Sequence, residues 1–468
     1  MSQGHQKMAS EAICSQNHSF CSLPPLKHRL SRVSLGQFFS DNTPVDPKNA
    51  DIYGEPSLDF SIARSIAPKS DIYMSSNSGD SKLYGSFAEL IYNKSVDIIS
   101  SSSEFGQDPG TFNLTEALNE LFIDALLRGQ TIVQSSGDVG ASSNRKFLPT
   151  GSTIPSPSES PAVLSVGGTA LNKNAKAITW PRSEVTLPTA FPPSFSQSTI
   201  DNLTGLISDQ YAWKANSFVP LTKEDRQDAI VYPTISNRFT SKDFIGSTLL
   251  PGAFDNLIGG SGVQYSSVLP MPAYQTENLS TQWHGTGRRY PDISALAGSS
   301  TKQESTSYYY FLDIVPNNAK TDFVPEVSIA GGTSAATPLV AGLLSNLLSY
   351  IRERFGQNLK FGMINSLLYE AYNSDYRDKL FFDVPAGTNN ANVFTIANNP
   401  DNWSGYTLIY QDETTKQKYL IPVNGTGPGG NLDTNLSSTG IGFDAATGLG
   451  SINGEGLLNQ LASVFSQL

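Results

Sequence analysis

A serine that precedes a long apolar stretch is the residue of this sequence best suited to nucleophilic chemistry. Ser334 lies in the segment 331–338 (GGTSAATP), and residues 338–351 are apolar almost all round, which predicts a buried helix. Glycines let a substrate approach the backbone closely. Unpaired N–H groups at a helix N-terminus also suit a developing oxyanion. The alternative is that Thr333 or Ser334 only caps the helix.

A nucleophilic serine needs a base, and histidine is the usual one. The sequence contains four histidines, of which His5, His18 and His28 lie in the irregular N-terminal part. His284 lies in a Trp-His-Gly-Thr run that follows the predicted central strands rather than preceding them, which favours a loop position. A subtilisin that uses His284 as its base remains an alternative.

Two carboxylates at helical spacing offer a different base. Glu55 and Asp59 are four residues apart in the segment 54–59 (GEPSLD), so at the start of a helix they share one face. Two like charges held together push their pKa values apart, so one carboxyl can hold a proton shared with the other. One carboxylate would then take the serine proton while the second orients it. The simpler interpretation is an acidic first turn favoured by the helix dipole.

A further acidic residue follows a predicted strand. Asp138 lies in the segment 135–140 (SSGDVG), after a strand predicted at 131–133. In open α/β sheets, sites form at the carboxyl ends of strands. An ionised Asp138 would repel an oxyanion, whereas a protonated one could donate a hydrogen bond to it, which requires low pH or strong burial. Taken alone, the run is also typical of a turn.

The elements that must position these residues alternate between helices and short apolar strands. Apolar residues at helical spacing predict helices over 56–66, 83–92, 114–128 and 338–351. Short apolar runs predict strands at 71–74, 96–99, 131–133 and 162–166. This alternation predicts an α/β fold with a parallel sheet covered by helices on both faces.

The domain organisation follows from changes in composition. Residues 1–50 show no sustained period and predict an irregular N-terminal segment, while residues 51–468 form one main domain. Within it, residues 170–257 are rich in Pro, Ser and Thr and predict a long insertion. Residues 380–450 turn to Gly, Asn, Asp and Thr, which predicts long turns.

The overall composition excludes several classes of protein. The chain has 468 residues, 38% of them apolar, and a net charge of −11 without any Lys or Arg run, so it has no signature of nucleic-acid binding. Cys14 and Cys21 are its only cysteines, too few for a zinc site or a disulfide framework; a local bridge and two free thiols both stay open. We see no apolar run long enough to cross a membrane and no signal peptide.

Glu55, Asp59, Asp138 and Ser334, in this order, resemble the catalytic residues of the sedolisin family of serine-carboxyl peptidases. The resemblance implies a subtilisin-like fold in which Glu55 is the general base, Asp59 the acid that orients it, Asp138 the oxyanion aspartate and Ser334 the nucleophile. Further stretches agree with the family at 166–169 (VGGT), 274–275 (YQ), 287–288 (GR) and 291–295 (PDISA).

Two C-terminal stretches, 382–384 (FDV) and 440–444 (GIGFD), are similar to the calcium loops of this family. The resemblance implies one Ca²⁺ ion as the cofactor. Its ligands would be the side chains of Asp383 and Asp444 and the backbone carbonyls of Val384, Gly440 and Gly442. Oxygen ligands from flexible loops are those that calcium prefers.

The resemblance covers residues 50–180 and 258–455, and it implies a monomeric endopeptidase that cleaves polypeptides at acidic pH through an acyl-enzyme. It also implies secretion or an acidic compartment. The chain departs from the family at Val139 and Val263, where Ser and Gly are usual, and in its short segment before Glu55. The alternative is therefore a catalytically inactive, sedolisin-like peptide-binding protein with incomplete N-terminal strands.

Overall fold

The computed structural model describes part of the chain, including Glu55, Asp59, Asp138 and Ser334. The described residues are 34–39, 54–76, 82–94, 96–103, 114–138, 157–171, 210–213, 230–231, 261, 264–266, 268–283, 287–298, 309–316, 323–385, 405–411, 418–424 and 439–466. Some residues discussed above lie outside these ranges, and their predictions are not tested: His5, His18, His28, His284, Cys14, Cys21, Val139 and Val263.

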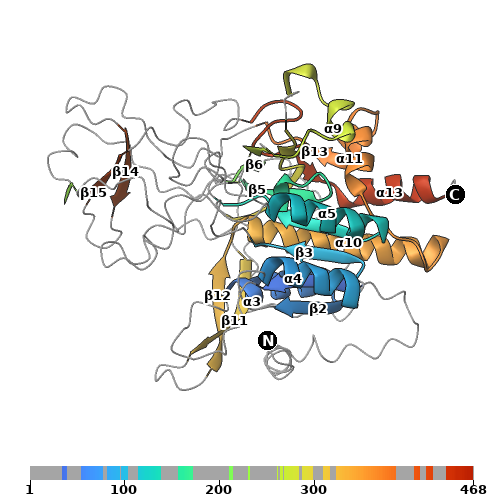
Figure 1. Ribbon diagram of the computed structural model, residues 1–468, viewed down its shortest axis with the longest axis horizontal. Coiled ribbons are helices and arrows are strands. Elements are labelled where there is room, and N and C mark those ends of the chain that lie inside the picture. The colour runs from blue at the N-terminus through green and yellow to red at the C-terminus, as the bar shows by residue number, and fades with distance from the viewer. Residues whose placement is uncertain are drawn as a thin grey trace, which may run out of the picture.

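A nine-stranded sheet forms the centre of the molecule (Figure 1). In spatial order its strands are β13 (Phe381–Phe382), β16 (Ser451–Ile452), β10 (Ile293–Leu296), β5 (Leu164–Leu171), β4 (Thr131–Ser135), β3 (Ile98–Ser101), β1 (Ser34–Phe39) and β2 (Asp71–Ser76). The strands from β16 to β2 run parallel to their neighbours, whereas β13 is antiparallel to β16. Beside this path, β6 (Gln210–Ala212) pairs antiparallel with β5.

The described helices alternate with these strands along the chain. They are α3 (Gly54–Ile66), α4 (Lys82–Ala88) with a π-helical continuation (Glu89–Lys94), α5 (Leu114–Leu127), α9 (Ala273–Thr276), α10 (Thr333–Phe355), α11 (Ile364–Tyr372), α12 (Arg377–Leu380) and α13 (Gly454–Phe465). Outside the central sheet lie three small sheets, formed by β8 (Gln264–Tyr265) with β9 (Arg289–Tyr290), by β11 (Tyr309–Pro316) with β12 (Phe323–Ala330), and by β14 (Gly405–Gln411), β15 (Lys418–Asn424) and β7 (Ile230–Val231).

Helices cover both faces of the central sheet. Successive residues of a strand point to opposite faces, yet Ile98 and Ile99 are both fully buried, and so are Ile132 and Val133. Ile99 and Ile132 pack with α4, its π-helical continuation and α5, whereas Ile98 and Val133 pack in the cluster that contains α10. The predicted α/β fold with a mostly parallel, two-sided sheet is confirmed.

Helix α10 is the central helix of one face and packs against β3, β4, β5 and β10. It is 23 residues long, and by length and composition alone it could cross a membrane. The expectation that no apolar run reaches that length is therefore wrong. Since 67% of its most apolar stretch is buried inside the protein, we interpret α10 as the core helix that the fold requires.

One predicted segment is wrong in part, and another is largely untested. Residues 34–39 of the segment predicted to be irregular form β1, which pairs with β2 and β3 on its two sides. Its short sequence, SLGQFF, has no clear period, so the strand depends on pairing with distant residues rather than on local pattern. Within the predicted insertion at 170–257, only β6, the neighbouring Trp213 and β7 are described, and the insertion stays a prediction.

Candidate active site

Ser334 is the second residue of α10, and Gly332 shapes the turn that precedes it. Gly332 has a φ of 116°, a conformation that favours glycine. A Cβ at this position would also lie only 2.4 Å from Oδ2 of Asp138. Glycine is thus required by the backbone and by the close approach of Asp138. The turn places Ser334 among the first N–H groups of α10, which have no acceptor within the helix.

The side chain of Glu55 lies close enough to that of Ser334 for the two to interact, and this interaction lowers the pKa of Glu55. Glu55 lies in the first turn of α3, which packs along α10 through an apolar cluster of Leu58, Ile62 and Ala335. The pKa of Glu55 is raised from its ordinary 4.5 to about 7. Desolvation is the main cause, the interaction with Ser334 opposes it, and the nearby charge of Asp138 adds to it.

The residue Glu55 nevertheless keeps an exposed surface. Water next to this residue therefore moderates the desolvation that raises the pKa of its carboxyl. A carboxylate whose pKa is raised binds a proton more strongly than an ordinary one, which suits the base of a serine hydroxyl.

Asp59 lies one helical turn further along α3 and is only 1% exposed. Burial raises the pKa of Asp59 well above its ordinary value, and the charge of Glu55 raises it further. Ser102, which follows β3, donates its hydroxyl proton to Oδ1 of Asp59 at 3.0 Å and lies 3.2 Å from the carbonyl oxygen of Ser334. Ser102 thus connects the second acid to the backbone of the candidate nucleophile.

Asp138 reaches the start of α10 from the loop after β4. Its Oδ1 accepts two hydrogen bonds from Thr333, one from the backbone N–H and one from the hydroxyl, both at 2.7 Å. The hydroxyl of Thr333 in turn accepts the N–H of Gly137 at 3.2 Å. Neither Thr333 nor Ser334 caps α10 with its side chain. The capping oxygen at Thr333 comes instead from Asp138, a residue distant in sequence.

The structure therefore brings all four sequence-predicted residues together. The side chain of Glu55 interacts with that of Ser334, and the charges of Asp138 and Glu55 raise the pKa values of Glu55 and Asp59, respectively. Asp138 accepts hydrogen bonds from the residue before Ser334. The arrangement offers a serine hydroxyl, a neighbouring carboxyl with a raised pKa, a second buried carboxyl whose pKa is raised well above its ordinary value, and a third carboxyl at a helix N-terminus. These are the parts required for acyl transfer.

Sequence reasoning missed Ser102 and the hydroxyl contact of Thr333. Ser102 follows β3 just as Asp138 follows β4, and β3 and β4 are parallel neighbours. Polar residues after neighbouring parallel strands meet at one edge of the sheet, and that rule could have indicated Ser102. The contact of Thr333 depends on the position of Asp138, which no local pattern predicts.

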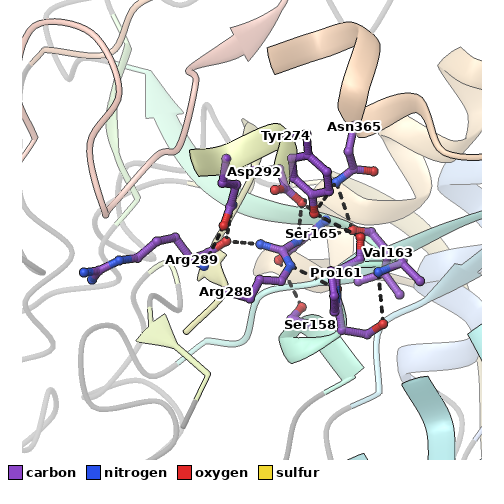
Figure 2. Close-up of polar contacts among 12 residues, drawn as sticks. Ser158, Pro161, Val163, Ser165, Tyr274, Arg288, Arg289, Asp292 and Asn365 are labelled. Atoms are coloured by element: carbon purple, nitrogen blue, oxygen red, sulfur yellow. Dashed lines mark hydrogen bonds and ion pairs between the residues drawn. The ribbon is translucent and has the colours of Figure 1, made fainter. Parts of the chain in front are cut away.

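The motif residues around Tyr274, Arg288 and Asp292 form a buried polar network rather than part of the candidate active site (Figure 2). Arg288 is fully buried and donates from Nη2 to Oδ2 of Asp292 at 2.5 Å. Asp292 also accepts hydrogen bonds from the Ser165 N–H, the Asn365 amide and the Tyr369 hydroxyl. The network ties the segment before β10 to β5 and α11, so we assign it to the stability of the sheet.

The predicted calcium ligands lie close together. Oδ2 of Asp383 accepts the N–H of Gly442 at 2.7 Å, and Oδ2 of Asp444 accepts the N–H of Gly440 at 3.3 Å. Burial is the main cause that raises the pKa of Asp444 to about 7, which is the expected behaviour of a carboxylate enclosed without a cation. Carboxylate oxygens such as those of Asp383 and Asp444 are the type of ligand that calcium binds.

The protein itself places one cation near these carboxylates. Arg377 lies 3.8 Å from Asp383, and both side chains are about one third exposed (36% and 34%). The described residues contain no group of three or more His, Cys, Asp or Glu side chains that could hold a metal. An ion here would therefore depend on backbone carbonyls, such as those of Val384, Gly440 and Gly442, in addition to the two carboxylates.

Comparisons with known proteins show the family to which the chain belongs. A family model described as the Subtilase family matches residues 8–390. The chain is 24% identical to kumamolisin of Bacillus sp. (strain MN-32) over 93% of its own length and 55% of that protein. It is 32% identical to tripeptidyl-peptidase 1 of Rattus norvegicus over 27% of its own length and 20% of that protein. The chain thus spans only part of the curated relatives that it matches.

Among solved structures, the chain is similar to Pseudomonas sedolisin, described as a serine-carboxyl proteinase complexed with two molecules of pseudo-iodotyrostatin. The TM-score is 0.50 at 19% identity, with 93% of this chain and 92% of that chain covered. At this identity the similarity concerns the fold. It supports the arrangement of sheet and helices described above.

Proposed function

Because this chain belongs to the subtilase family, we propose that it is a serine peptidase that cleaves polypeptides with Ser334 as its nucleophile. The resemblance to sedolisins inferred from the sequence is confirmed by the similarity to kumamolisin and to a sedolisin structure. The observation that carries the proposal is the interaction between the side chains of Glu55 and Ser334, which lowers the pKa of Glu55. It joins the nucleophile to a carboxylate, so the enzyme would be of the serine-carboxyl type.

In the first step of the proposed reaction, the Ser334 oxygen attacks the carbonyl carbon of a peptide bond and its proton passes to Glu55. The raised pKa of Glu55 makes this carboxylate a stronger base than usual. Asp59, whose pKa is raised well above its ordinary value, stays protonated beside it. The pair therefore carries one negative charge rather than two adjacent ones.

The negative charge that develops on the substrate oxygen would be held at the start of α10. The backbone N–H of Ser334 is one donor, and a protonated Asp138 is the other. The positive end of the α10 dipole supports both. Collapse of the tetrahedral intermediate transfers the proton from Glu55 to the leaving amine and forms an ester on Ser334. A water molecule, deprotonated by Glu55, then hydrolyses the ester and restores the serine.

This scheme implies a bell-shaped dependence of activity on pH. At low pH the Glu55–Asp59 pair takes up a second proton and loses its base. At higher pH Asp138 loses its proton and would repel the oxyanion. From the resemblance to the sedolisins, we propose that the enzyme works on the acidic side of neutrality, in an acidic compartment or after secretion into an acidic medium. The acidic composition of the chain, with a net charge of −11, is compatible with such conditions.

We further propose that one calcium ion stabilises the C-terminal loops. The carboxylates of Asp383 and Asp444, with the carbonyls of Val384, Gly440 and Gly442, would hold it. Calcium would supply a positive charge that offsets the desolvation of Asp444. In the segment that follows Asp444, the N–H of Leu449 donates to the carbonyl of Asp292. A calcium ion that keeps these loops in place would therefore also support β10, which begins after Asp292.

The proposal is tested by cleavage of a denatured protein between pH 3 and 7, with and without calcium. We expect wild type to cleave it and Ser334→Ala to be inactive. Ser65→Ala is the matched control, because Ser65 is an exposed residue of α3 that bonds only within its own helix in the described structure. A folded wild-type protein that binds the substrate and never cleaves it would support the inactive peptide-binding alternative instead.

A further inference from the structure

Asp138 can stabilise an oxyanion only if its proton is on the oxygen that faces the substrate. A carboxylic acid has two oxygens, and in water its proton exchanges freely between them. The residues around Asp138 therefore decide how large a fraction of the enzyme has the donor in the correct place. Thr333 contacts one of these oxygens twice.

We propose that Thr333 is a positioning residue that keeps the proton of Asp138 on Oδ2. The inference rests on the proposed function and deepens it, since it names the residue that prepares the oxyanion donor. It concerns the side chain of Thr333, which does not touch the reacting atoms and acts only through Asp138.

The direction of the Thr333 hydroxyl is fixed by its neighbours. Thr333 is 1% exposed, and its oxygen accepts the N–H of Gly137 at 3.2 Å. The hydroxyl proton then points to Oδ1 of Asp138, 2.7 Å away, where the backbone N–H of Thr333 also arrives at 2.7 Å. An oxygen that accepts two donors cannot carry the acid proton toward them. When Asp138 is neutral, Oδ1 is therefore the carbonyl oxygen and Oδ2 carries the proton.

The other oxygen lies beside the turn that starts α10. Oδ2 of Asp138 occupies the space next to Gly332 that a side chain would fill, 2.4 Å from the position of a Cβ. Gly332 immediately precedes α10, so Oδ2 lies beside the N-terminus that carries the N–H of Ser334. The proton held on Oδ2 and the Ser334 N–H then form the two donors of the proposed oxyanion hole.

Removing the hydroxyl of Thr333 should redistribute this proton. Thr333→Val keeps the branched shape and the backbone N–H, but Oδ1 loses one of its two donors and Gly137 loses its acceptor. The carboxyl can then rotate and hold its proton on either oxygen. Losing an oxyanion donor outright typically lowers kcat about 10²–10³-fold. A misplaced donor should cost less, and we expect roughly a 10–100-fold loss of kcat for Thr333→Val on this scale.

The experiment measures kcat and KM for wild type, Thr333→Val, Thr333→Ser, Asp138→Ala and the double variant Thr333→Val/Asp138→Ala. Thermal unfolding of each variant checks folding, and Thr333→Ala replaces the valine variant if that variant does not fold. We expect Thr333→Val to lower kcat while KM stays nearly unchanged. Thr333→Ser keeps the hydroxyl and should have the kcat of wild type. In the Asp138→Ala background, Thr333→Val should cause no further loss, because Thr333 then has no carboxyl to orient.

The results distinguish this inference from the proposed function. If wild type cleaves, Ser334→Ala does not, and Thr333→Val has the kcat of wild type, then only the role of Thr333 is overturned. An equal cost of Thr333→Val with and without Asp138, or a loss in Thr333→Ser as large as in Thr333→Val, also overturns it, because Thr333 would then act through packing alone. If Ser334→Ala cleaves as fast as wild type, or wild type does not cleave, the proposed function fails and the inference fails with it.

Discussion

Replacing Gly332 by alanine tests how closely Asp138 must approach the start of α10. Gly332 has φ 116° and ψ 170°, a region nearly exclusive to glycine, where another residue costs about 1–3 kcal/mol. The added methyl group would also lie 2.4 Å from Oδ2 of Asp138, so the carboxyl must move away from α10. Loss of one oxyanion donor lowers the rate about 10²–10³-fold. We therefore expect Gly332→Ala to reduce kcat about 100-fold and to lower stability as well.

Gly356→Ala separates the two effects. Gly356 ends the same helix with φ 145°, and an added Cβ would meet no atom within 4 Å. Backbone strain alone predicts that both variants lose about 1–3 kcal/mol in urea unfolding, while only Gly332→Ala loses activity. The assay is cleavage of a denatured protein at saturating substrate under conditions where both variants are folded. Wild-type kcat in Gly332→Ala, or an equal loss of kcat in both variants, would refute the reasoning.

Three further predictions concern other parts of the structure. Ser102→Ala removes the hydrogen bond that lowers the pKa of Asp59, so Asp59 should hold its proton more strongly and the acid limb of a pH–kcat profile, which reports Glu55, should stay where it is; a shifted acid limb would contradict the roles given to the two acids. Asp97→Ala removes the salt bridge that Asp97 forms with the buried Arg352 and should cost about 3–5 kcal/mol in urea unfolding, with kcat of the folded enzyme unchanged. Chelation of calcium should lower the melting temperature of wild type but not of Asp444→Asn; an equal response in both would contradict the proposed calcium site.

The parts of the fold that local pattern encodes could be predicted from the sequence. The strands β2 to β5 and the helices α3, α5 and α10 follow from apolar periodicity and from the glycines and prolines at their ends. The strand β1 could not be predicted, because SLGQFF becomes a strand only by pairing with β2 and β3 on its two sides.

The same distinction applies to the candidate active site. Ser334 and the pair Glu55 and Asp59 each lie in a local motif at the start of a helix, so the residue types indicated their chemistry. The position of Ser102 after β3 could have indicated that it lies at the site, but the contacts that Ser102 and Thr333 make join residues that are far apart in the chain, and no local pattern predicts them. The interaction between the side chains of Glu55 and Ser334 likewise depends on how α3 packs against α10.

The most direct test of the account is a comparison of kcat/KM for Glu55→Gln and His284→Ala with that of wild type. Glutamine keeps the size of Glu55 and can still contact Ser334, but it cannot accept the serine proton. Positioned proton transfer contributes about 10²–10⁴-fold to catalysis, so the account predicts a loss of that size in Glu55→Gln and wild-type activity in His284→Ala. Retained activity in Glu55→Gln together with an inactive His284→Ala would contradict it.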